Sequence, residues 1–129
     1  MKEYIKGLSH IGVPVKNLTE SAAFYESLGF TRVGSDTDRE GNEKVVFMAY
    51  KGITYELYVN HGACCVPGAI NHIALAVDDI NGAFLAAKKA GYTFTTPGIG
   101  SNPDFIGRGN SYFMIAGPDG DLVEFCKMW

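Results

Sequence analysis

The stretch NHIALAVDDINGAFLAAKKAGYT, residues 71–93, repeats the earlier stretch SHIGVPVKNLTESAAFYESLGFT, residues 9–31, without a gap. The two stretches align at a constant offset of 62, which pairs His10 with His72, Val15 with Val77 and Gly29 with Gly91. Self-similarity over this length indicates two copies of one structural unit. The chain is therefore predicted to be a doubled unit.

A glutamate also recurs in the later part of each copy. Small insertions separate the copies further along the chain, and Glu56 in TYEL corresponds to Glu124 in LVEF 68 positions later. Each copy thus offers one histidine in an early strand pattern and one glutamate in a later strand. Imidazole nitrogens and carboxylate oxygens are ligands of divalent metals. The repeat predicts a metal site built from two equivalent pairs, His10 with Glu56 and His72 with Glu124.

Composition limits the class of protein. At 129 residues, with 47% hydrophobic and 19% charged residues, the chain is long enough for one compact domain. The net charge of -3 and the absence of a basic cluster exclude a nucleic-acid or anionic-membrane partner. Three cysteines are an odd number, which argues against a disulfide framework. No apolar run suits a signal peptide or a membrane span, so a cytoplasmic location is expected.

Hydrophobic periodicity and turn residues predict the order βαβββ in each copy. In the first copy Asn17 begins a helix that ends at Gly29, and in the second Asp78 or Asp79 begins one that ends at Gly91. Residues 97–110 are rich in glycine and proline and are predicted to be a mobile loop without an element of its own. The predicted strands cover residues 8–15, 30–34, 44–50, 53–59, 70–77, 92–96, 111–116 and 121–128.

The two copies are predicted to form one domain over residues 1–129. Its modules are residues 1–62 and 69–129, joined by the glycine- and proline-containing linker 61–69. In the strand 53–59, alternation places Glu56 on one face with Thr54 and Tyr58.

These segments resemble the vicinal oxygen chelate superfamily, and within it glyoxalase I, the lactoylglutathione lyase family. The resemblance covers nearly the whole chain and is carried by ELYVNHG (56–62), NHIALAVDD (71–79) and GPDGDLVEF (117–125). It implies an α+β protein of the glyoxalase/bleomycin resistance/dioxygenase fold. In that fold two tandem βαβββ modules form a cup-shaped mixed sheet around a divalent metal.

The resemblance also implies roles for individual residues. The ligands of one Ni, Zn, Co or Mn ion are then His10, Glu56, His72 and Glu124. Glu124 is the implied catalytic base, and Glu56 is the second catalytic carboxylate. Asn60 falls where the family contacts its thiol cosubstrate, although an asparagine there also suits the cap of a turn.

Further substrate contacts are expected from Phe47, Met114 and Arg108. Phe47 and Met114 belong to FM pairs that align 66 positions apart, at 47–48 and 113–114, and packing in the core is the simpler role for such residues. Arg108, in the predicted loop, is a candidate cation for an anionic substrate. Glyoxalase I has an arginine four residues after its first histidine, whereas this chain has Pro14, so only weak use of glutathione is expected.

The activity implied is that of a glyoxalase I-like lyase. It isomerises a hemithioacetal of methylglyoxal and a small thiol to a lactoyl thioester through an enediolate. Two alternatives remain, an epimerase of the methylmalonyl-CoA type and a metal-free module that binds drugs. A homodimer with sites at or near the subunit interface is expected, because two such modules leave strand edges exposed.

Overall fold

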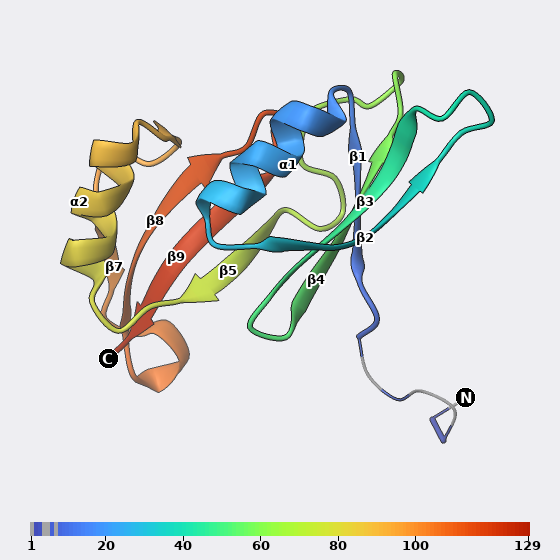
Figure 1. Cartoon of the computed structure of the whole chain (residues 1–129). Helices are drawn as coiled ribbons and strands as arrows, with labels where there is room; N and C mark the ends of the chain where they lie inside the picture. The colour runs from blue at the N-terminus through green and yellow to red at the C-terminus, as the bar shows by residue number, and fades with distance from the viewer. Residues whose placement is uncertain (1, 4–5, 7) are drawn as a thin grey trace. The chain divides into compact units, whose positions relative to one another are not determined.

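The computed structural model describes residues 2–3, 6 and 8–129, and the chain divides into two compact units, Met1–Cys64 and Cys65–Trp129. Each unit holds one copy of the repeat, with its own sheet and its own helix (Figure 1). The α+β class and the two tandem βαβββ modules predicted from the sequence are confirmed. The assignment of both modules to one domain stays a prediction.

The first unit is a four-stranded mixed sheet with one helix. Its strand order is β1-β4-β3-β2, in which β1 runs parallel to β4 and the other pairs are antiparallel. The elements are β1 (Ile11–Val15), α1 (Leu18–Ser27), β2 (Thr31–Thr37), β3 (Glu43–Tyr50) and β4 (Ile53–Val59).

A side-chain cap sets the start of α1, and packing against one face of the sheet sets its position. The Asn17 side chain accepts a hydrogen bond from the Glu20 backbone N–H at 3.1 Å, as the sequence predicts for an N-cap. The helix packs on β3 and β4, where Tyr25 is 1% exposed and its ring centroid lies 4.5 Å from that of Tyr55. Burial of such a side chain contributes about 2 kcal/mol. The α1 side of the sheet is therefore the core of this unit.

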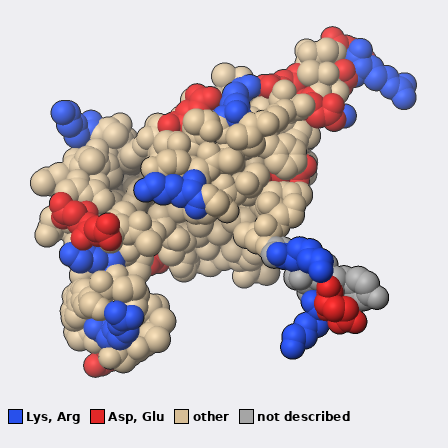
Figure 2. All heavy atoms as spheres, turned by 60° about the horizontal axis from the view of Figure 1, so that its bottom comes forward, with Lys and Arg blue, Asp and Glu red and all other residues tan. Residues whose placement is uncertain are grey.

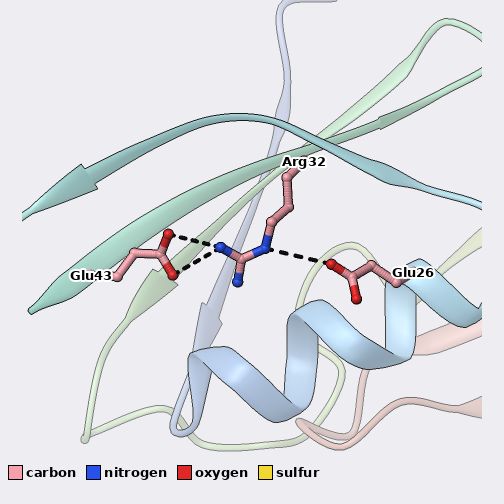
Figure 3. A network of polar contacts seen from close by, with 3 residues as sticks. All are labelled: Glu26, Arg32 and Glu43. Carbon is pink, nitrogen blue, oxygen red and sulfur yellow. Dashed lines mark hydrogen bonds and ion pairs between the residues drawn. The ribbon is translucent and has the colours of Figure 1, made fainter.

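Arg32 on β2 links the edge of this sheet to α1. Its Nη1 lies 2.9 Å from a Glu43 carboxylate oxygen on β3, and its Nε lies 3.5 Å from Glu26 on the helix (Figure 3). All three side chains are at least one-third exposed, so solvent weakens the attraction and the network contributes little to stability.

The second unit repeats the arrangement. Its strand order is β5-β9-β8-β6, with β5 parallel to β9, and β7 also pairs with β8. Asp79 caps the helix by accepting from the Gly82 N–H at 3.0 Å, and Gly91 ends it with φ of 78°. The elements are β5 (His72–Ala76), α2 (Ile80–Ala90), β6 (Thr93–Phe94), β7 (Gly100–Asn102), the 3₁₀ helix η1 (Phe105–Gly107), β8 (Asn110–Ala116) and β9 (Leu122–Met128).

Several boundaries differ from the sequence prediction. The strand β1 begins at Ile11 rather than at residue 8, β5 covers only His72–Ala76 instead of 70–77, and β6 only Thr93–Phe94 instead of 92–96. The predicted loop 97–110 contains β7 and η1, because backbone hydrogen bonds to β8 order a segment whose side chains give no strand pattern. The strand β2 continues to Thr37, three residues into the predicted polar turn, because its backbone pairs with β3 up to Glu43.

The strand register also corrects the alignment of the FM pairs. Phe47 lies opposite Glu56, whereas the residue opposite Glu124 is Met114. Phe47 is thus equivalent to Met114, one position away from the predicted match with Phe113. A shift of one residue exchanges the faces of a strand, and Phe113 accordingly lies in the core at 0% exposure.

No large patch of one charge sign gathers on the face that Figure 2 shows, where lysines and arginines are scattered among acidic residues. Among the residues that the structure describes, no helix is long and apolar enough to cross a membrane, and the longer one, α2, has 11 residues.

Candidate metal site

In each unit the predicted histidine and glutamate lie on the sheet face opposite the helix. Parallel pairing places Gly12 on β1 opposite Glu56 on β4, and Ala74 on β5 opposite Glu124 on β9. Gly12 lies beside the Glu56 carboxylate, since an added Cβ would be in van der Waals contact with Glu56 Oε2 at 3.8 Å. Each histidine lies two residues before the small residue, and its Nε2 reaches the carboxylate on this face.

The pair in the first unit is His10 with Glu56. His10 Nε2 lies 3.1 Å from Glu56 Oε2, and its Nδ1 lies 3.1 Å from Ser9 Oγ. The Phe47 ring meets the imidazole edge to face, with centroids 5.5 Å apart and an interplanar angle of 82°. The contacts at Nδ1 and at the ring face fix the orientation of the imidazole.

The pair in the second unit has the same geometry. His72 Nε2 lies 3.2 Å from Glu124 Oε2, and His72 Nδ1 lies 3.0 Å from Asn71 Oδ1. The Glu124 side chain is 14% exposed, compared with 29% for Glu56. Each imidazole therefore has one nitrogen held by the preceding side chain and the other directed at a carboxylate.

The donor chemistry of these pairs fits a divalent cation. The Asn71 amide oxygen takes an N–H from His72 Nδ1, which in a neutral imidazole leaves a lone pair on Nε2. That lone pair faces the carboxylate oxygen of Glu124. A cation bound between His72 Nε2 and the Glu124 oxygen would accept electron density from both. Ligand atoms about 2.1 Å from one ion lie about 3.0 Å apart at a right angle and about 3.4 Å apart at the tetrahedral angle. The observed separations of 3.1 and 3.2 Å fall within this range.

Each unit brings two such ligands together. Within the described part of the chain, no three or more His, Cys, Asp or Glu side chains cluster closely enough to hold a metal. A site with four ligands therefore needs both pairs, and their union stays a prediction.

A cavity of about 580 Å³ opens over the second pair. It lies on the sheet face opposite α2, and part of its wall comes from β7 and η1, the segment predicted to be a loop. The lining residues are His72, Ala74, Asn102, Phe105, Asn110, Tyr112, Glu124 and Cys126.

Six residues of this lining were not predicted as site residues. One of them, Ala74, follows from His72 by alternation along β5. Alternation from Glu124 along β9 leads to Cys126, and alternation from Met114 along β8 leads to Tyr112 and Asn110. Asn102 and Phe105 had no comparable signal, because β7 and η1 were not predicted.

The other predicted contacts are dispersed. Asn60 Oδ1 accepts from the Gly62 N–H at 2.9 Å, which is the turn-capping role. Phe47 contacts His10, and Met114 lies opposite Glu124. Arg108 is exposed at the end of η1 and is not among the residues that line the cavity. Substrate contact by these four residues stays a prediction.

A repeated βαβββ unit with a histidine–glutamate pair in each copy defines a class of two-module proteins with candidate metal ligands on their sheets. The model of the Glyoxalase/Bleomycin resistance protein/Dioxygenase superfamily matches residues 7–125, and the chain belongs to this superfamily. The chain is 31% identical over 125 residues to the uncharacterized protein YwbC of Bacillus subtilis (strain 168), a match that spans 93% of this chain and 96% of YwbC.

Solved structures share the fold. A glyoxalase/bleomycin resistance protein/dioxygenase from Alicyclobacillus acidocaldarius superposes with a TM-score of 0.73 at 16% identity, covering 96% of this chain and 92% of that one. The fosfomycin resistance protein FosX from Listeria monocytogenes gives 0.72 at 21% identity, with 95% and 93% covered. At these identities the likeness establishes the fold alone.

Proposed function

We propose that this protein is a metal-dependent lyase that isomerises the hemithioacetal of methylglyoxal and a small thiol to a lactoyl thioester. The observation that carries the proposal is the pair of equivalent His–Glu contacts, 3.1 and 3.2 Å long, each with its imidazole oriented by the preceding side chain. Two equivalent pairs on partly exposed sheet faces support a shared role as metal ligands.

The metal ligands in this proposal are His10, Glu56, His72 and Glu124, one pair from each module, within one chain or between two chains of a homodimer. Two carboxylates balance the charge of a divalent ion. When bound, such an ion would supply stabilisation of the negative charge that develops on the substrate. FosX of the same fold was crystallised with Mn(II), so Mn²⁺ belongs with Ni²⁺, Zn²⁺ and Co²⁺ among the ions to test.

Glu124 is the proposed base. Its carboxylate takes the proton from the thiol-bearing carbon of the hemithioacetal, which gives an enediolate, and then returns it to the neighbouring carbon. The carbon next to sulfur becomes the thioester carbonyl, and the former ketone becomes the lactoyl alcohol. Glu124 suits this role because it is the less exposed of the two glutamates and lines the cavity. Glu56 acts mainly as a ligand.

The direct test is metal analysis of protein purified without chelators, followed by a methylglyoxal assay with several thiols. The proposal expects bound metal and metal-dependent formation of the thioester. Tight binding of aromatic compounds with neither metal nor turnover would contradict it and favour a metal-free binding module.

A further inference from the structure

Gly100 on β7 lies directly opposite Tyr112 on β8 and leaves free the space that the Tyr112 ring occupies. A Cβ added to Gly100 would lie 2.9 Å from Tyr112 Cζ, 3.1 Å from its Cε1 and 3.2 Å from its hydroxyl oxygen. Carbon atoms in ordinary contact are about 3.5–4.0 Å apart, so the ring cannot keep this position beside any other residue. The glycine thus lets the Tyr112 side chain lie against β7.

The Tyr112 ring is the part of this contact that can move. The three atoms concerned lie at the far end of a flexible side chain, whereas an overlap with backbone would have to shift the strand itself. Gly100 is not one of the described glycines with positive φ, so its backbone accepts other residues. A larger residue at position 100 is therefore expected to displace the ring at little cost to the fold.

The displaced ring would move along the lining of the cavity. Tyr112 lines the cavity, and its partner on the other side is Cys126 on β9, which lines it too. Directly opposed residues of antiparallel strands share a face of the sheet, so Gly100, Tyr112 and Cys126 form one row across this face. A ring that leaves Gly100 thus moves toward Cys126 and takes up room in the cavity.

The cavity has more room than a methyl group needs. Its volume of about 580 Å³ is in the range of sites that hold whole small molecules. Ala74 and the rings of Phe105 and Tyr112 give part of its lining an apolar surface. An apolar group of the size of a phenyl ring, at one end of the hemithioacetal, matches this surface.

We infer that Gly100, acting through Tyr112, sets the size of the apolar group that the substrate places in the cavity. The group belongs either to the oxoaldehyde or to the thiol, the two ends of the hemithioacetal. Gly100 determines specificity in this way and takes no part in the proton transfer. The inference rests on the proposed lyase function, because it concerns the substrate of that reaction.

The first test enlarges position 100 and compares small and bulky substrates. Methylglyoxal and phenylglyoxal, each with 2-mercaptoethanol, vary the oxoaldehyde, and 2-mercaptoethanol and benzyl mercaptan, each with methylglyoxal, vary the thiol. The unmodified protein is expected to turn over the bulky substrate of at least one series. In that series Gly100→Val is expected to lower kcat/KM for the bulky substrate, relative to the small one, by about tenfold or more. An unchanged ratio in both series would overturn the inference.

Two controls test whether the effect comes from the displaced ring. Gly98 has no atom within 4 Å of an added Cβ, so Gly98→Val is expected to leave the ratio unchanged. In a Tyr112→Ala background the valine at position 100 has no ring to displace, and Gly100→Val is expected to change the ratio by less than about twofold. An equal change in Gly98→Val, or a full effect without the ring, would show that Gly100 does not act through Tyr112.

Binding of unreactive product analogues separates the inference from the lyase function. Lactamide carries no bulky group, mandelamide has a phenyl ring at the acyl end, and N-benzyl-lactamide has one at the end of the thiol. Calorimetric titration of the metal-loaded protein gives their affinities. Suppose that no hemithioacetal is turned over, but Gly100→Val weakens one aryl amide by about tenfold and leaves lactamide unchanged: the size limit at Gly100 then stands while the lyase function fails. Equal effects on all three amides would overturn the inference.

Discussion

Glu56 and Glu124 occupy equivalent positions and yet have different surroundings, since Glu124 is half as exposed and lines the cavity. Substitution by glutamine separates metal binding from proton transfer at such a residue. The side-chain carbonyl oxygen of glutamine still coordinates a metal, but its amide cannot act as a base. Glu124→Gln is expected to keep much of the metal and to lose about 10²-fold or more in kcat, the scale of general-base catalysis.

Glu56→Gln is the matched control and is expected to lower kcat less than Glu124→Gln does. Metal content and rate are measured for both variants at saturating metal, so that lost occupancy is not mistaken for lost chemistry. If Glu124→Gln is fully metallated and active while Glu56→Gln is inactive, the assignment of the base is inverted.

Asn71 orients His72 without belonging to the proposed ligands. Asn71→Leu removes the oxygen that holds Nδ1 at 3.0 Å, and a lost partner of this kind lowers metal affinity by about 10–100-fold. Competition with a metal-sensitive dye measures the affinity directly. Asn81→Leu, on the exposed first turn of α2, is the control and is expected to leave it unchanged. Equal affinities in all three proteins would show that Asn71 does not orient a ligand.

At the scale of elements, the segment that carries β7 and η1 is held in place at Gly109. This glycine has φ of 85°, and an added Cβ would overlap the Trp129 indole and lie 2.9 Å from the Pro103 carbonyl oxygen. Trp129 in turn donates from Nε1 to Ser111 Oγ at 2.9 Å. The wall of the cavity thus depends on the close approach of Gly109 to the Trp129 indole and the Pro103 carbonyl oxygen.

Gly109→Ala is therefore expected to lower the free energy of unfolding by about 3 kcal/mol, the sum of a left-handed backbone and overpacking. Gly107→Ala is the control, because Gly107 has φ of 66° but no atom within 4 Å of an added Cβ. It is expected to cost about 1 kcal/mol. Urea denaturation measures both, and equal losses would show that the contact with Trp129 contributes nothing.

Much of each unit was predictable from the sequence because its signals are local. Asn17 and Asp79 cap their helices through their own side chains, and the period-two pattern of β4 gave its bounds as observed. The strand β7 was not predictable in this way. Glycine, serine and asparagine form it only because β8 offers backbone partners, which a local pattern does not reveal.

The candidate site also has a part that was predictable from the sequence and a part that was not. The two pairs followed from the repeat, since equivalent strands place equivalent residues on the same sheet face. The remaining lining of the cavity depends on which segment folds over that face. Phe105 and Asn102 reach it through β7 and η1, so their role is a property of tertiary structure.

At the scale of the whole molecule, the expected assembly is a homodimer. Both β1 and β5 are edge strands of their sheets and have backbone groups that further pairing would satisfy. Light scattering is expected to give twice the chain mass. A monomer that still binds one metal per chain would exclude sites that need ligands from two subunits.

The most direct measurement is metal stoichiometry, because the central claim is that the two His–Glu pairs bind one ion together. Protein dialysed against a limited excess of metal is expected to retain one ion per chain. His10→Ala and His72→Ala are each expected to lower the affinity for that ion by at least about tenfold. Both variants affect the same ion although they alter different units. Two ions per chain, with each variant losing only one of them, would show that the pairs act independently and would contradict the account.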